Sequence, residues 1–134
     1  MTLIVCLDDS LGMTFNNRRQ SRDSVVTKDI LKAAGGRLLI SPFSEKLFSE
    51  FRDVRVLENP LSDGSPDDFC FIEIGRVRPY IDKIHEIIIY RWNRLYPSDT
   101  QFDIDPAEHG FKLSLISEFV GTSHEKITKE IYRR

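Results

Sequence analysis

Residues able to bind an anion are concentrated in one short stretch of the sequence, MTFNNRRQSRDS at 13–24. Five of them stand at the start of the first helical pattern: Arg18, Arg19, Gln20, Ser21 and Arg22. A guanidinium holds phosphate or carboxylate through two parallel hydrogen bonds, and the unpaired N–H groups at a helix start favour negative charge. The stretch therefore predicts an anion-binding site. The alternative is a solvated loop whose arginines pair with Asp8, Asp9 and Asp23.

A second group of candidate ligand contacts follows the most apolar predicted strand, in YRWNRLYP at 90–97. Its members are Arg91, Trp92, Asn93 and Arg94. Aromatic faces stack on nucleobases and arginines hold phosphates, so this composition predicts contacts to a nucleotide. Strand alternation also allows another interpretation, in which Tyr90 and Trp92 belong to the core and the two arginines lie at the surface.

Carboxylates are candidates for acid chemistry or for metal binding. Asp8 and Asp9 directly follow the first predicted strand, where a phosphodiester hydrolase would hold a divalent cation. A second acidic group lies in the loop at 98–109 and consists of Asp99, Asp103, Asp105, Glu108 and His109. Its spacing matches no EF-hand loop, so a solvated loop is the favoured interpretation. Asp8 and Asp9 remain candidates, and no complete set of metal ligands is predicted.

Ser123, His124 and Glu125 stand next to one another near the end of the sequence. Neighbouring residues on a helix point about 100° apart, so Ser123 and His124 would not form a nucleophile–base pair. As a general base, His124 would need partners that are remote in sequence. The favoured interpretation is capping of a final helix, because Thr122 and Glu125 have capping-box spacing.

The elements that must position these groups begin with an apolar strand at 2–7. A helical repeat of apolar residues then extends from about Ser21 to Ala34, with Ser21 as its cap and Gly35-Gly36 as its end. A second strand is predicted at 37–41. Strand, helix and strand in this order indicate a right-handed parallel βαβ unit, whose ligands bind beyond the carboxyl ends of the strands.

A second α/β unit is predicted to follow. Ser41-Pro42 is typical of a helix start. The remaining predicted elements are strands at 54–58, 69–74, 86–92 and 111–119, a turn or short helix beginning at Pro79, and a last helix from Thr122 to Tyr132. The fold class predicted for residues 1–134 is a single three-layer α/β domain, with a mostly parallel or mixed sheet of about five to six strands and three helices.

Composition sets the class of protein. With 19 basic and 21 acidic residues the net charge is −2, which argues against bulk binding of nucleic acid. No apolar run approaches ~18 residues, so a soluble cytoplasmic protein without membrane contacts is expected. Cys6 and Cys70 lie in separate apolar runs and are expected to be buried thiols. No cofactor is expected, because Gly12 stands without a glycine-rich phosphate loop.

Longer segments of the sequence support a resemblance to one group of proteins. The segments are CLDDSLGMTFNNRRQSRD, SPFSEKLF, FCFIE, IIIYRWNRLYPSDTQFDI and GTSHEKITKEIY. Over nearly the whole chain they resemble a group of small Firmicutes proteins that are frequently labelled ribonuclease Z. The resemblance implies a common fold and a common site. Ribonuclease Z itself requires an HxHxDH metal cluster, and His85, His109 and His124 do not stand in that spacing, so no catalytic residue is carried over.

Three functions compete for these residues. The favoured hypothesis is a protein that sequesters a phosphate-bearing small molecule, such as a nucleotide or nucleotide-derived signal, in the manner of mobile-element or phage counter-defence proteins. The arginines at 18–22 would hold its anion, while Trp92 and Asn93 contact its base. The first alternative is a metal-dependent phosphodiester hydrolase or nuclease that uses Asp8 and Asp9. The second is a protein-interaction module, such as an immunity or inhibitor protein. Catalysis and formation of a homo-oligomer are both left open.

Overall fold

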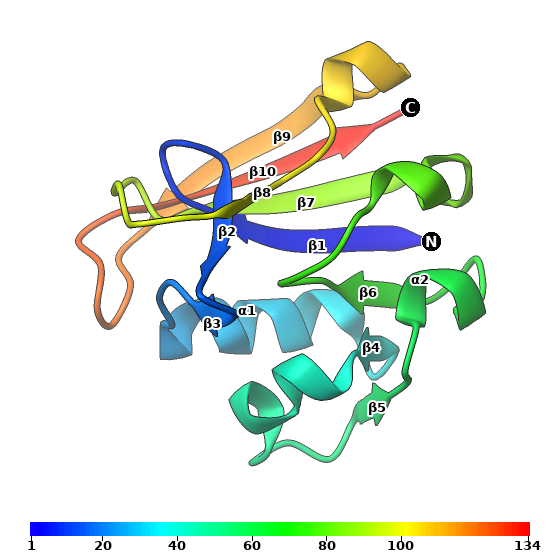
Figure 1. Cartoon of the computed structure of the whole chain (residues 1–134), viewed down its shortest axis with the longest axis horizontal. Coiled ribbons are helices and arrows are strands. Elements are labelled where there is room, and N and C mark those ends of the chain that lie inside the picture. Colours follow the sequence, from blue (N-terminus) through cyan, green and yellow to red (C-terminus); the bar gives the residue numbers. More distant parts are fainter.

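The protein is described by a computed structural model that covers residues 1–134. Its main feature is a seven-stranded sheet in the order β5-β4-β6-β1-β7-β10-β9 (Figure 1). The strands are β1 (Thr2–Leu7), β4 (Leu38–Ile40), β5 (Val54–Val56), β6 (Phe69–Phe71), β7 (Glu86–Arg91), β9 (Lys112–Phe119) and β10 (Ile127–Arg133). Five neighbouring strands, β5, β4, β6, β1 and β7, run parallel to one another. Strand β10 runs antiparallel to both of its neighbours, β7 and β9. The α/β class predicted from the sequence is confirmed, with more strands than expected.

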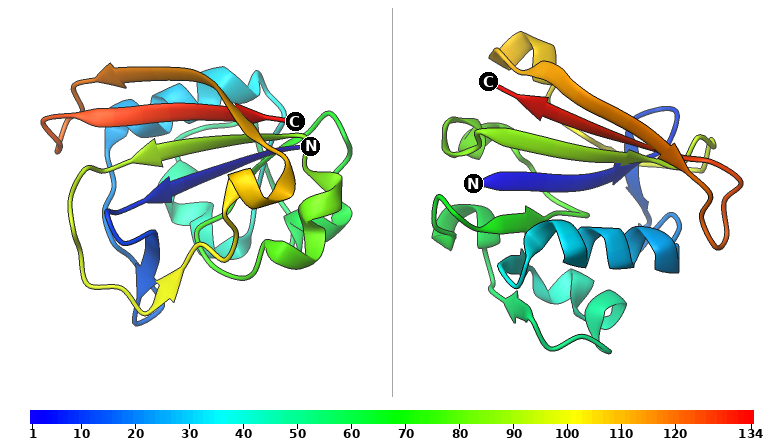
Figure 2. Two further views of the ribbon diagram at one scale, coloured as in Figure 1. Left: turned by 90° about the horizontal axis from the view of Figure 1, so that it is seen from above. Right: turned by 180° about the vertical axis from the view of Figure 1, so that it is seen from behind.

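Helices and a small second sheet surround the main sheet (Figure 2). The small sheet has the order β3-β2-β8 and consists of β2 (Gly12–Phe15), β3 (Arg18–Arg19) and β8 (Thr100–Gln101). The helical segments are α1 (Ser24–Ala34), the short α2 (Pro60–Asp63) and the 3₁₀ segments η1 (Pro42–Phe48), η2 (Arg78–Lys83) and η3 (Pro106–His109). None of these helices has the length and apolar character needed to span a lipid bilayer.

Alternating side chains of β1 belong to two hydrophobic cores, one on each face of the sheet. Leu3 and Leu7 pack with the chain around η2 and η3. Ile4 points to the other face and packs with Ile30 of α1 and Phe48 of η1. Because both faces of β1 are covered, its sequence is a continuous apolar run, as is typical of a central parallel strand. The sheet is the middle one of three layers.

Helix α1 begins at Ser24, slightly later than its sequence pattern predicts. Asp23 is its N-cap: its backbone is extended, and its carboxylate accepts a hydrogen bond from the N–H of Val25. The prediction of Ser21 as the cap is wrong, because its hydroxyl is directed to His124 instead. A carboxylate therefore already occupies the helix N-terminus, where it would repel a bound anion. Gly35 ends the helix with φ 55°, as the Gly35-Gly36 pair predicts.

The arginine-rich stretch forms a hairpin between β2 and β3. Asn16 and Asn17 are its two turn residues, with φ 51° and 58°. Two consecutive positive φ values are typical of a type I′ turn, a conformation that asparagine tolerates. The asparagines therefore build the turn, and the two arginines after it continue as β3, which lies near the carboxyl ends of β1 and β6 (Figure 1).

The end of the chain forms strand β10, so the predicted helix from Thr122 to Tyr132 is wrong. Strand β10 pairs with β7 on one side and β9 on the other, which satisfies its backbone hydrogen-bonding groups. This pairing involves residues far away in the sequence, so a local pattern cannot predict it. Ile127 and Ile131 lie on the face toward α1, whereas Tyr132 packs against the other core. The capping box does not form, because the N–H of Thr122 donates to Asp23.

The two cysteines are free thiols. Cys70 is buried, and burial raises its pKa to about 12. Cys6 is half-buried on the face toward α1. Burial, and after it the nearby Glu73 carboxylate, raise the pKa of Cys6 well above its ordinary value. Both thiols are therefore protonated and weakly reactive at neutral pH.

Candidate functional site

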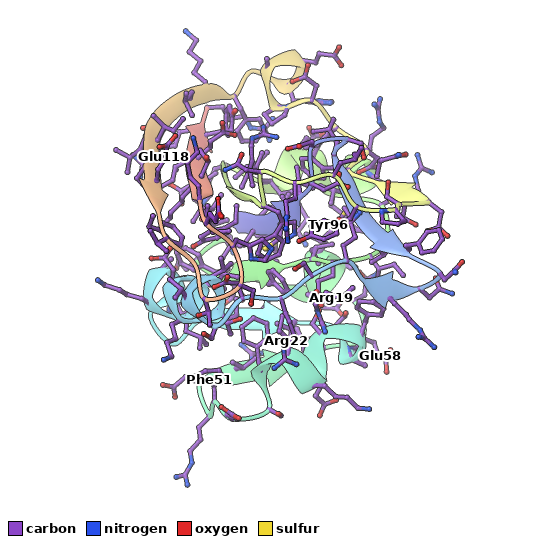
Figure 3. The ribbon with its side chains drawn as sticks, turned by 90° about the vertical axis from the view of Figure 1, so that its left-hand side faces the viewer. Arg19, Arg22, Phe51, Glu58, Tyr96 and Glu118 are labelled. Carbon is purple, nitrogen blue, oxygen red and sulfur yellow. The ribbon has the colours of Figure 1, made fainter.

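A narrow cavity lies at the carboxyl ends of β1, β6 and β7, the edge where an open parallel sheet binds its ligands. Its apolar wall includes Ile30, Phe71 and Trp92, and its polar wall is formed by residues 19–23 and Glu73. The cavity volume is about 20 Å³, room for about one water molecule. Figure 3 looks onto this edge and shows Arg19 between Tyr96 and Arg22. The protein's own side chains fill most of the site.

An ion pair between Arg19 of β3 and Glu73, just after β6, forms the polar centre of the cavity. Both Nε and Nη2 of Arg19 donate to the Glu73 carboxylate, the latter at 2.8 Å. Ser44 Oγ donates to the same carboxylate at 2.6 Å. The Glu73 side chain is 7% exposed and that of Arg19 22%, so water reaches the pair poorly, and the hydrogen bond to Glu73 raises the pKa of Arg19. Arg19 binds a carboxylate of its own chain here.

A basic groove adjoins the cavity, between the segment at 17–22 and η1. Its cationic side chains are Arg18, Arg19, Arg22 and Lys46, and no carboxylate lines it. Arg18 and Arg22 are exposed and form no ion pair with Asp8, Asp9 or Asp23, as the solvated-loop interpretation would have required. The structure thus brings together the cations predicted at 18–22, with Arg19 already engaged by Glu73.

Asp8 holds the beginning of the same segment in place. Its carboxylate accepts two N–H groups of the following turn at 2.9 and 2.7 Å, the N–H of Tyr96 at 3.1 Å and the side-chain amide of Gln20 at 3.1 Å. Burial would raise the pKa of Asp8, but these hydrogen bonds outweigh it and lower that pKa. Asp9 is exposed, and no group of three or more His, Cys, Asp or Glu side chains is arranged to hold a metal ion. The role of Asp8 is therefore structural.

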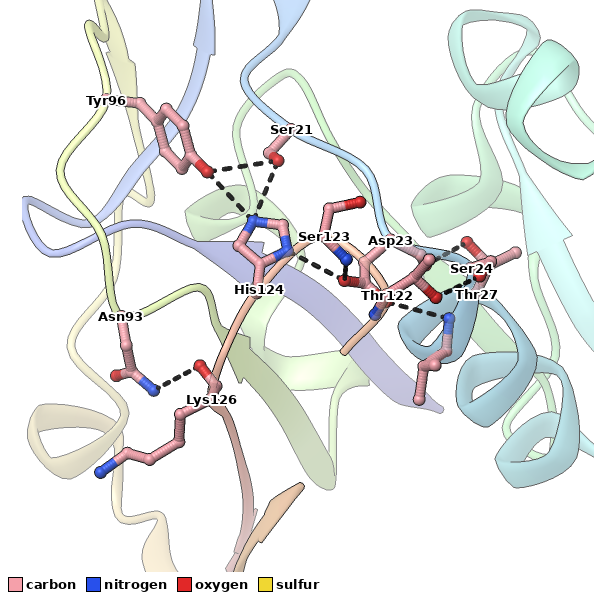
Figure 4. Close-up of polar contacts among 11 residues, drawn as sticks. Ser21, Asp23, Ser24, Thr27, Asn93, Tyr96, Thr122, Ser123, His124 and Lys126 are labelled. Atoms are coloured by element: carbon pink, nitrogen blue, oxygen red, sulfur yellow. Dashed lines mark hydrogen bonds and ion pairs between the residues drawn. The ribbon is translucent and has the colours of Figure 1, made fainter. Parts of the chain in front are cut away.

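Asp23 connects α1 to the turn that precedes β10. Besides capping α1, its carboxylate accepts the N–H groups of Thr122 and Ser123 at 2.9 and 2.8 Å, and Nδ1 of His124 lies 2.9 Å away (Figure 4). Burial by itself would raise the pKa of Asp23. The hydrogen bonds from His124, Thr122, Ser123 and Val25 outweigh burial and lower the pKa to about 2. Asp23 is thus an ionised, fully buried acceptor of four hydrogen bonds.

His124 directs its second ring nitrogen toward two hydroxyl groups. Nε2 lies 3.1 Å from Ser21 Oγ and 3.0 Å from Tyr96 OH (Figure 4). Trp92 stacks on the imidazole with ring centroids 4.6 Å apart. Because Asp23 accepts the Nδ1 proton, Nε2 is the acceptor nitrogen of the neutral ring. His124 therefore has remote partners of the kind that a general base requires, and its predicted role in capping a helix is wrong.

Only one of the four candidate contacts at 91–94 faces the cavity, and that residue is Trp92. Arg91 pairs with Glu130 at 2.7 Å. Asn93 adopts φ 57° and donates its amide to the Lys126 carbonyl oxygen and to Thr128 Oγ1. Arg94 lines a separate groove. The predicted convergence of Arg91, Asn93 and Arg94 with the arginines at 18–22 does not occur.

The acidic loop at 98–109 serves the fold. Asp103 accepts two backbone N–H groups at the start of η2, at 2.9 and 3.0 Å. Asp105 caps η3, and Asp99 accepts the N–H of Asn16 in the hairpin turn. These three carboxylates act as acceptors for backbone groups.

Glu73, Ser44 and Tyr96 belong to the site but were not among the predicted residues. Glu73 stands at the carboxyl end of a predicted parallel strand, and a lone carboxylate in the run FCFIEI was a usable signal. Tyr96 lies inside the YRWNRLYP segment, but no role was predicted for it. Nothing local distinguishes Ser44, whose importance follows from its contact with Glu73 alone.

Comparisons with known proteins yield a likeness in structure. No protein-family model matches the chain, and neither does any curated protein. Among solved structures, the chain is similar over 99% of its length to dihydrofolate reductase from Enterococcus faecalis, in a complex with NADP(H) and RAB-propyl. The TM-score is 0.71, the sequence identity is 12%, and 95% of the enzyme chain is covered. The likeness establishes that the fold is of the dihydrofolate reductase type.

This comparison corrects the functional predictions. The chain shares its architecture with a dihydrofolate reductase whose solved structure contains NADP(H). The predictions of a protein that sequesters a phosphate-bearing signal, of a metal-dependent phosphodiester hydrolase and of an interaction module are therefore wrong. The sequestration hypothesis rested on a free anion site around Arg19, whereas Arg19 is paired with Glu73.

Proposed function

We propose that the protein binds NADP(H) and a folate-like heterocycle, as a reductase of the dihydrofolate reductase type. The observation that carries the proposal is the Glu73 carboxylate, which lies in a cavity at the carboxyl edge of the sheet and faces the planar guanidinium of Arg19. The whole-chain likeness to a dihydrofolate reductase in a complex with NADP(H) supports the choice of ligands.

The Glu73 carboxylate suits a ring with two neighbouring N–H donors. A 2-aminopteridine such as dihydrofolate presents an amino group and a ring N–H side by side, the same donor arrangement as the edge of a guanidinium. Arg19 presents that edge to Glu73 in the ligand-free protein. The heterocycle would take over these two hydrogen bonds while Ser44 continues to hold the carboxylate. Arg19 is thus an internal substitute that the ligand displaces.

The basic groove fits the phosphates of NADP(H). Its three arginines and one lysine are accompanied by no carboxylate, which matches the charge of a dinucleotide phosphate. Arg18, Arg22 and Lys46 would hold the phosphates, since their cations are not committed to partners within the chain. When bound, the cofactor supplies a hydride. The protein contributes charge complementarity in the groove and an apolar wall at Phe71 and Trp92 beside it.

Two probes test the cavity and the groove separately. Trp92 is the only tryptophan and lines the cavity, so its fluorescence reports ligand entry. A 2,4-diaminopyrimidine probes the cavity and NADPH probes the groove. We expect Glu73→Gln to weaken the diaminopyrimidine at least tenfold, about 1.4 kcal/mol, and to leave NADPH affinity nearly unchanged. The double change Arg18→Ala/Arg22→Ala should do the reverse.

The matched control is Arg37→Ala, which removes an exposed arginine whose contact with Asp67 is 3.9 Å long. It should leave both affinities unchanged, because Arg37 belongs to neither the cavity nor the groove. Turnover is then measured as NADPH oxidation with dihydrofolate as the acceptor. Failure of the protein to bind either probe would overturn the proposal, as would equal effects of Arg37→Ala and Arg18→Ala/Arg22→Ala on NADPH.

A further inference from the structure

A second chemical group lies at the edge of the cavity and has no part in the proposed binding of the heterocycle. Ser21, His124 and Asp23 are joined by hydrogen bonds in that order (Figure 4). We propose that Ser21 is a nucleophile for acyl transfer, with His124 as its general base and Asp23 as the residue that positions His124. Triads of this type are recognised by geometry and roles, whatever their order in the sequence.

The distances and the burial of the three side chains match these roles. Ser21 Oγ lies 3.1 Å from Nε2 and Asp23 Oδ2 lies 2.9 Å from Nδ1, within the range of about 2.6–3.2 Å expected for such pairs. The side chains of His124 and Asp23 are 1% and 0% exposed. Three backbone N–H groups fix the Asp23 carboxylate, and Trp92 stacks on the imidazole, so both side chains are held in place.

The arrangement permits a complete hydrolytic cycle on an ester. His124 Nε2 takes the Ser21 proton while Oγ forms a bond to the carbonyl carbon. The bond from that carbon to the alcohol oxygen then breaks, and the alcohol leaves with the proton held by His124. A water molecule, deprotonated by His124, attacks the acylated Ser21. The carboxylic acid is released and the Ser21 hydroxyl is restored.

The surroundings of Ser21 define the class of ester. The N–H groups of Ser21 and Arg22 have no acceptor within the chain and are available to a developing oxyanion. The adjoining groove carries Arg22 and Lys46, which favour a negatively charged alcohol. The cavity itself has room for about one water molecule, so the acyl group is short. The substrate class is therefore a short acyl ester of an anionic alcohol.

Tyr96 distinguishes a nucleophile from a purely structural network. Its hydroxyl lies 3.0 Å from the same Nε2 and competes with Ser21 for the base. In Tyr96→Phe, Nε2 is left to Ser21 alone. A nucleophilic Ser21 should then react at least as fast as in the wild-type protein. Slower reaction of Tyr96→Phe, or reaction at Tyr96 itself, would overturn the assignment.

The test uses the full chain without NADP(H) or heterocycle, so it is independent of the proposed reductase function. The protein is treated with an alkyl fluorophosphonate, and with p-nitrophenyl acetate in parallel; peptide mass spectrometry locates the adduct. We expect one adduct, on Ser21, which is absent in Ser21→Ala and forms on the order of 100-fold more slowly in His124→Gln.

The matched control is Ser24→Ala, because the Ser24 hydroxyl contacts only that of Thr122 and no histidine. It should react like the wild-type protein. Circular dichroism and thermal unfolding establish that each variant is folded. A folded wild-type protein without an adduct on Ser21, or an adduct that survives in Ser21→Ala, would overturn the proposal. Loss of NADPH binding in a separate experiment would leave it unaffected.

A different observation, at the edge of the sheet, carries a second inference. β9 is the outermost strand, at the end opposite β5. Its apolar side chains Leu113, Leu115 and Ile116 are 49%, 55% and 54% exposed, and the following Val120 is 74% exposed. A long apolar edge strand is a template for pairing with another chain. Within β9, charges stand only at Lys112 and Glu118, near its two ends.

We infer that β9 pairs antiparallel with β9 of a second copy of the chain, so that the two main sheets become continuous. The charges at the strand ends favour this occupant. β9 carries a bulge at Ser114 against β10, and we expect this bulge to straighten when β9 pairs on its free edge. In the regular register with Leu115 opposite Leu115 of the second copy, Lys112 faces Glu118 of that copy, and the pair occurs twice by symmetry. Within one chain, Glu118 contacts only Lys126, at 3.4 Å and with both side chains more than half exposed.

Charge reversal tests both the dimer and its register. Sedimentation velocity should show a dimer for the wild-type protein, at least tenfold weaker dimerisation for Lys112→Glu and for Glu118→Lys, and recovery in the double variant. Leu115→Lys should give a monomer. Val56→Lys, which alters an exposed apolar residue on the opposite edge strand β5, is the matched control and should remain dimeric. A monomeric wild-type protein, or a double variant no better than the single ones, would overturn the inference.

Discussion

Replacing Arg19 by alanine should separate the stability of the cavity from its capacity for a ligand. In this variant the Glu73 carboxylate, 7% exposed, keeps Ser44 as its only donor. Removing one partner of a buried pair costs about 3–5 kcal/mol, and because the Arg19 side chain is 22% exposed we expect the lower end, roughly 3 kcal/mol. At about 4 °C per kcal/mol for a domain of this size, the melting temperature should fall by roughly 12 °C. Adding Glu73→Gln removes the unpaired charge and should restore most of the loss.

The same variant should bind the heterocycle more tightly than the wild-type protein does. In the wild type a 2,4-diaminopyrimidine has to displace Arg19 before it reaches Glu73, whereas in Arg19→Ala the carboxylate is already free. We expect at least a tenfold gain in affinity, about 1.4 kcal/mol, and its disappearance in Arg19→Ala/Glu73→Gln.

Urea unfolding followed by Trp92 fluorescence measures the stability, and calorimetry measures the binding. A stability loss below about 0.5 kcal/mol would mean that the pair is not effectively buried. Weaker binding of the diaminopyrimidine by Arg19→Ala would refute the displacement of Arg19, because it would make Arg19 a direct ligand contact.

Three further predictions concern Asp23, Gly121 and the thiols. The pKa of Asp23 is about 2 in the folded protein, below its ordinary value of 3.8, so its contribution of roughly 2 kcal/mol is present above pH 4 and is lost as the pH falls toward 2. Urea unfolding at pH 2–5 should show this slope in the wild type and a shallower one in Asp23→Asn, where Asp8, whose pKa is also lowered, still contributes. A methyl group at Gly121 would overlap the Asp23 carboxylate, so Gly121→Ala should cost about 1–3 kcal/mol in chemical denaturation and should slow reaction at Ser21. Ellman's reagent should label Cys6 and Cys70 slowly in the native protein and rapidly after unfolding, since the pKa of both thiols is raised.

Elements with a strong local signal could be predicted from the sequence. The apolar run of β1, the apolar face of α1 and the Gly35-Gly36 end of that helix all depend on residues close together in the chain. The edge strand β9 was also predicted, close to its actual bounds. In each of these elements, a few neighbouring residues determine both the backbone conformation and the burial. Their hydrophobic pattern is therefore sufficient to predict the element.

The final helix shows where local patterns fail. Thr122 and Glu125 have the spacing of a capping box, but Asp23 takes the N–H of Thr122 from 99 positions away. The segment after it then pairs with β7 and β9, and Thr128, for example, pairs with Arg91. Those backbone hydrogen bonds and the packing of Ile127 in the core outweigh a weak local preference for helix.

Sequence reasoning placed residues 18–22 at the carboxyl edge of the sheet, but it did not show which groups they contact. The rule that ligands bind at the carboxyl ends of parallel strands selected residues 18–22, and these do line the cavity and the groove. The sequence could not show that Arg19 reaches Glu73, 54 positions away, or that Ser21 reaches His124, 103 positions away. Both contacts depend on the order of the strands in the sheet, and this order cannot be predicted from the pattern of any single segment.

The segment that carries Arg19 and Ser21 is anchored at both ends, and this determines how the cavity opens. Asp8 holds Gln20 and the turn at Gly12, while Asp23 holds the start of α1 and the turn before β10. Opening by movement of the whole segment would break these hydrogen bonds to two buried carboxylates. Rotation of the Arg19 side chain breaks only its own pair with Glu73. Displacement of the Arg19 side chain is therefore the less costly route. The apparent ligand affinity is the intrinsic affinity multiplied by the fraction of molecules in which Arg19 has left Glu73.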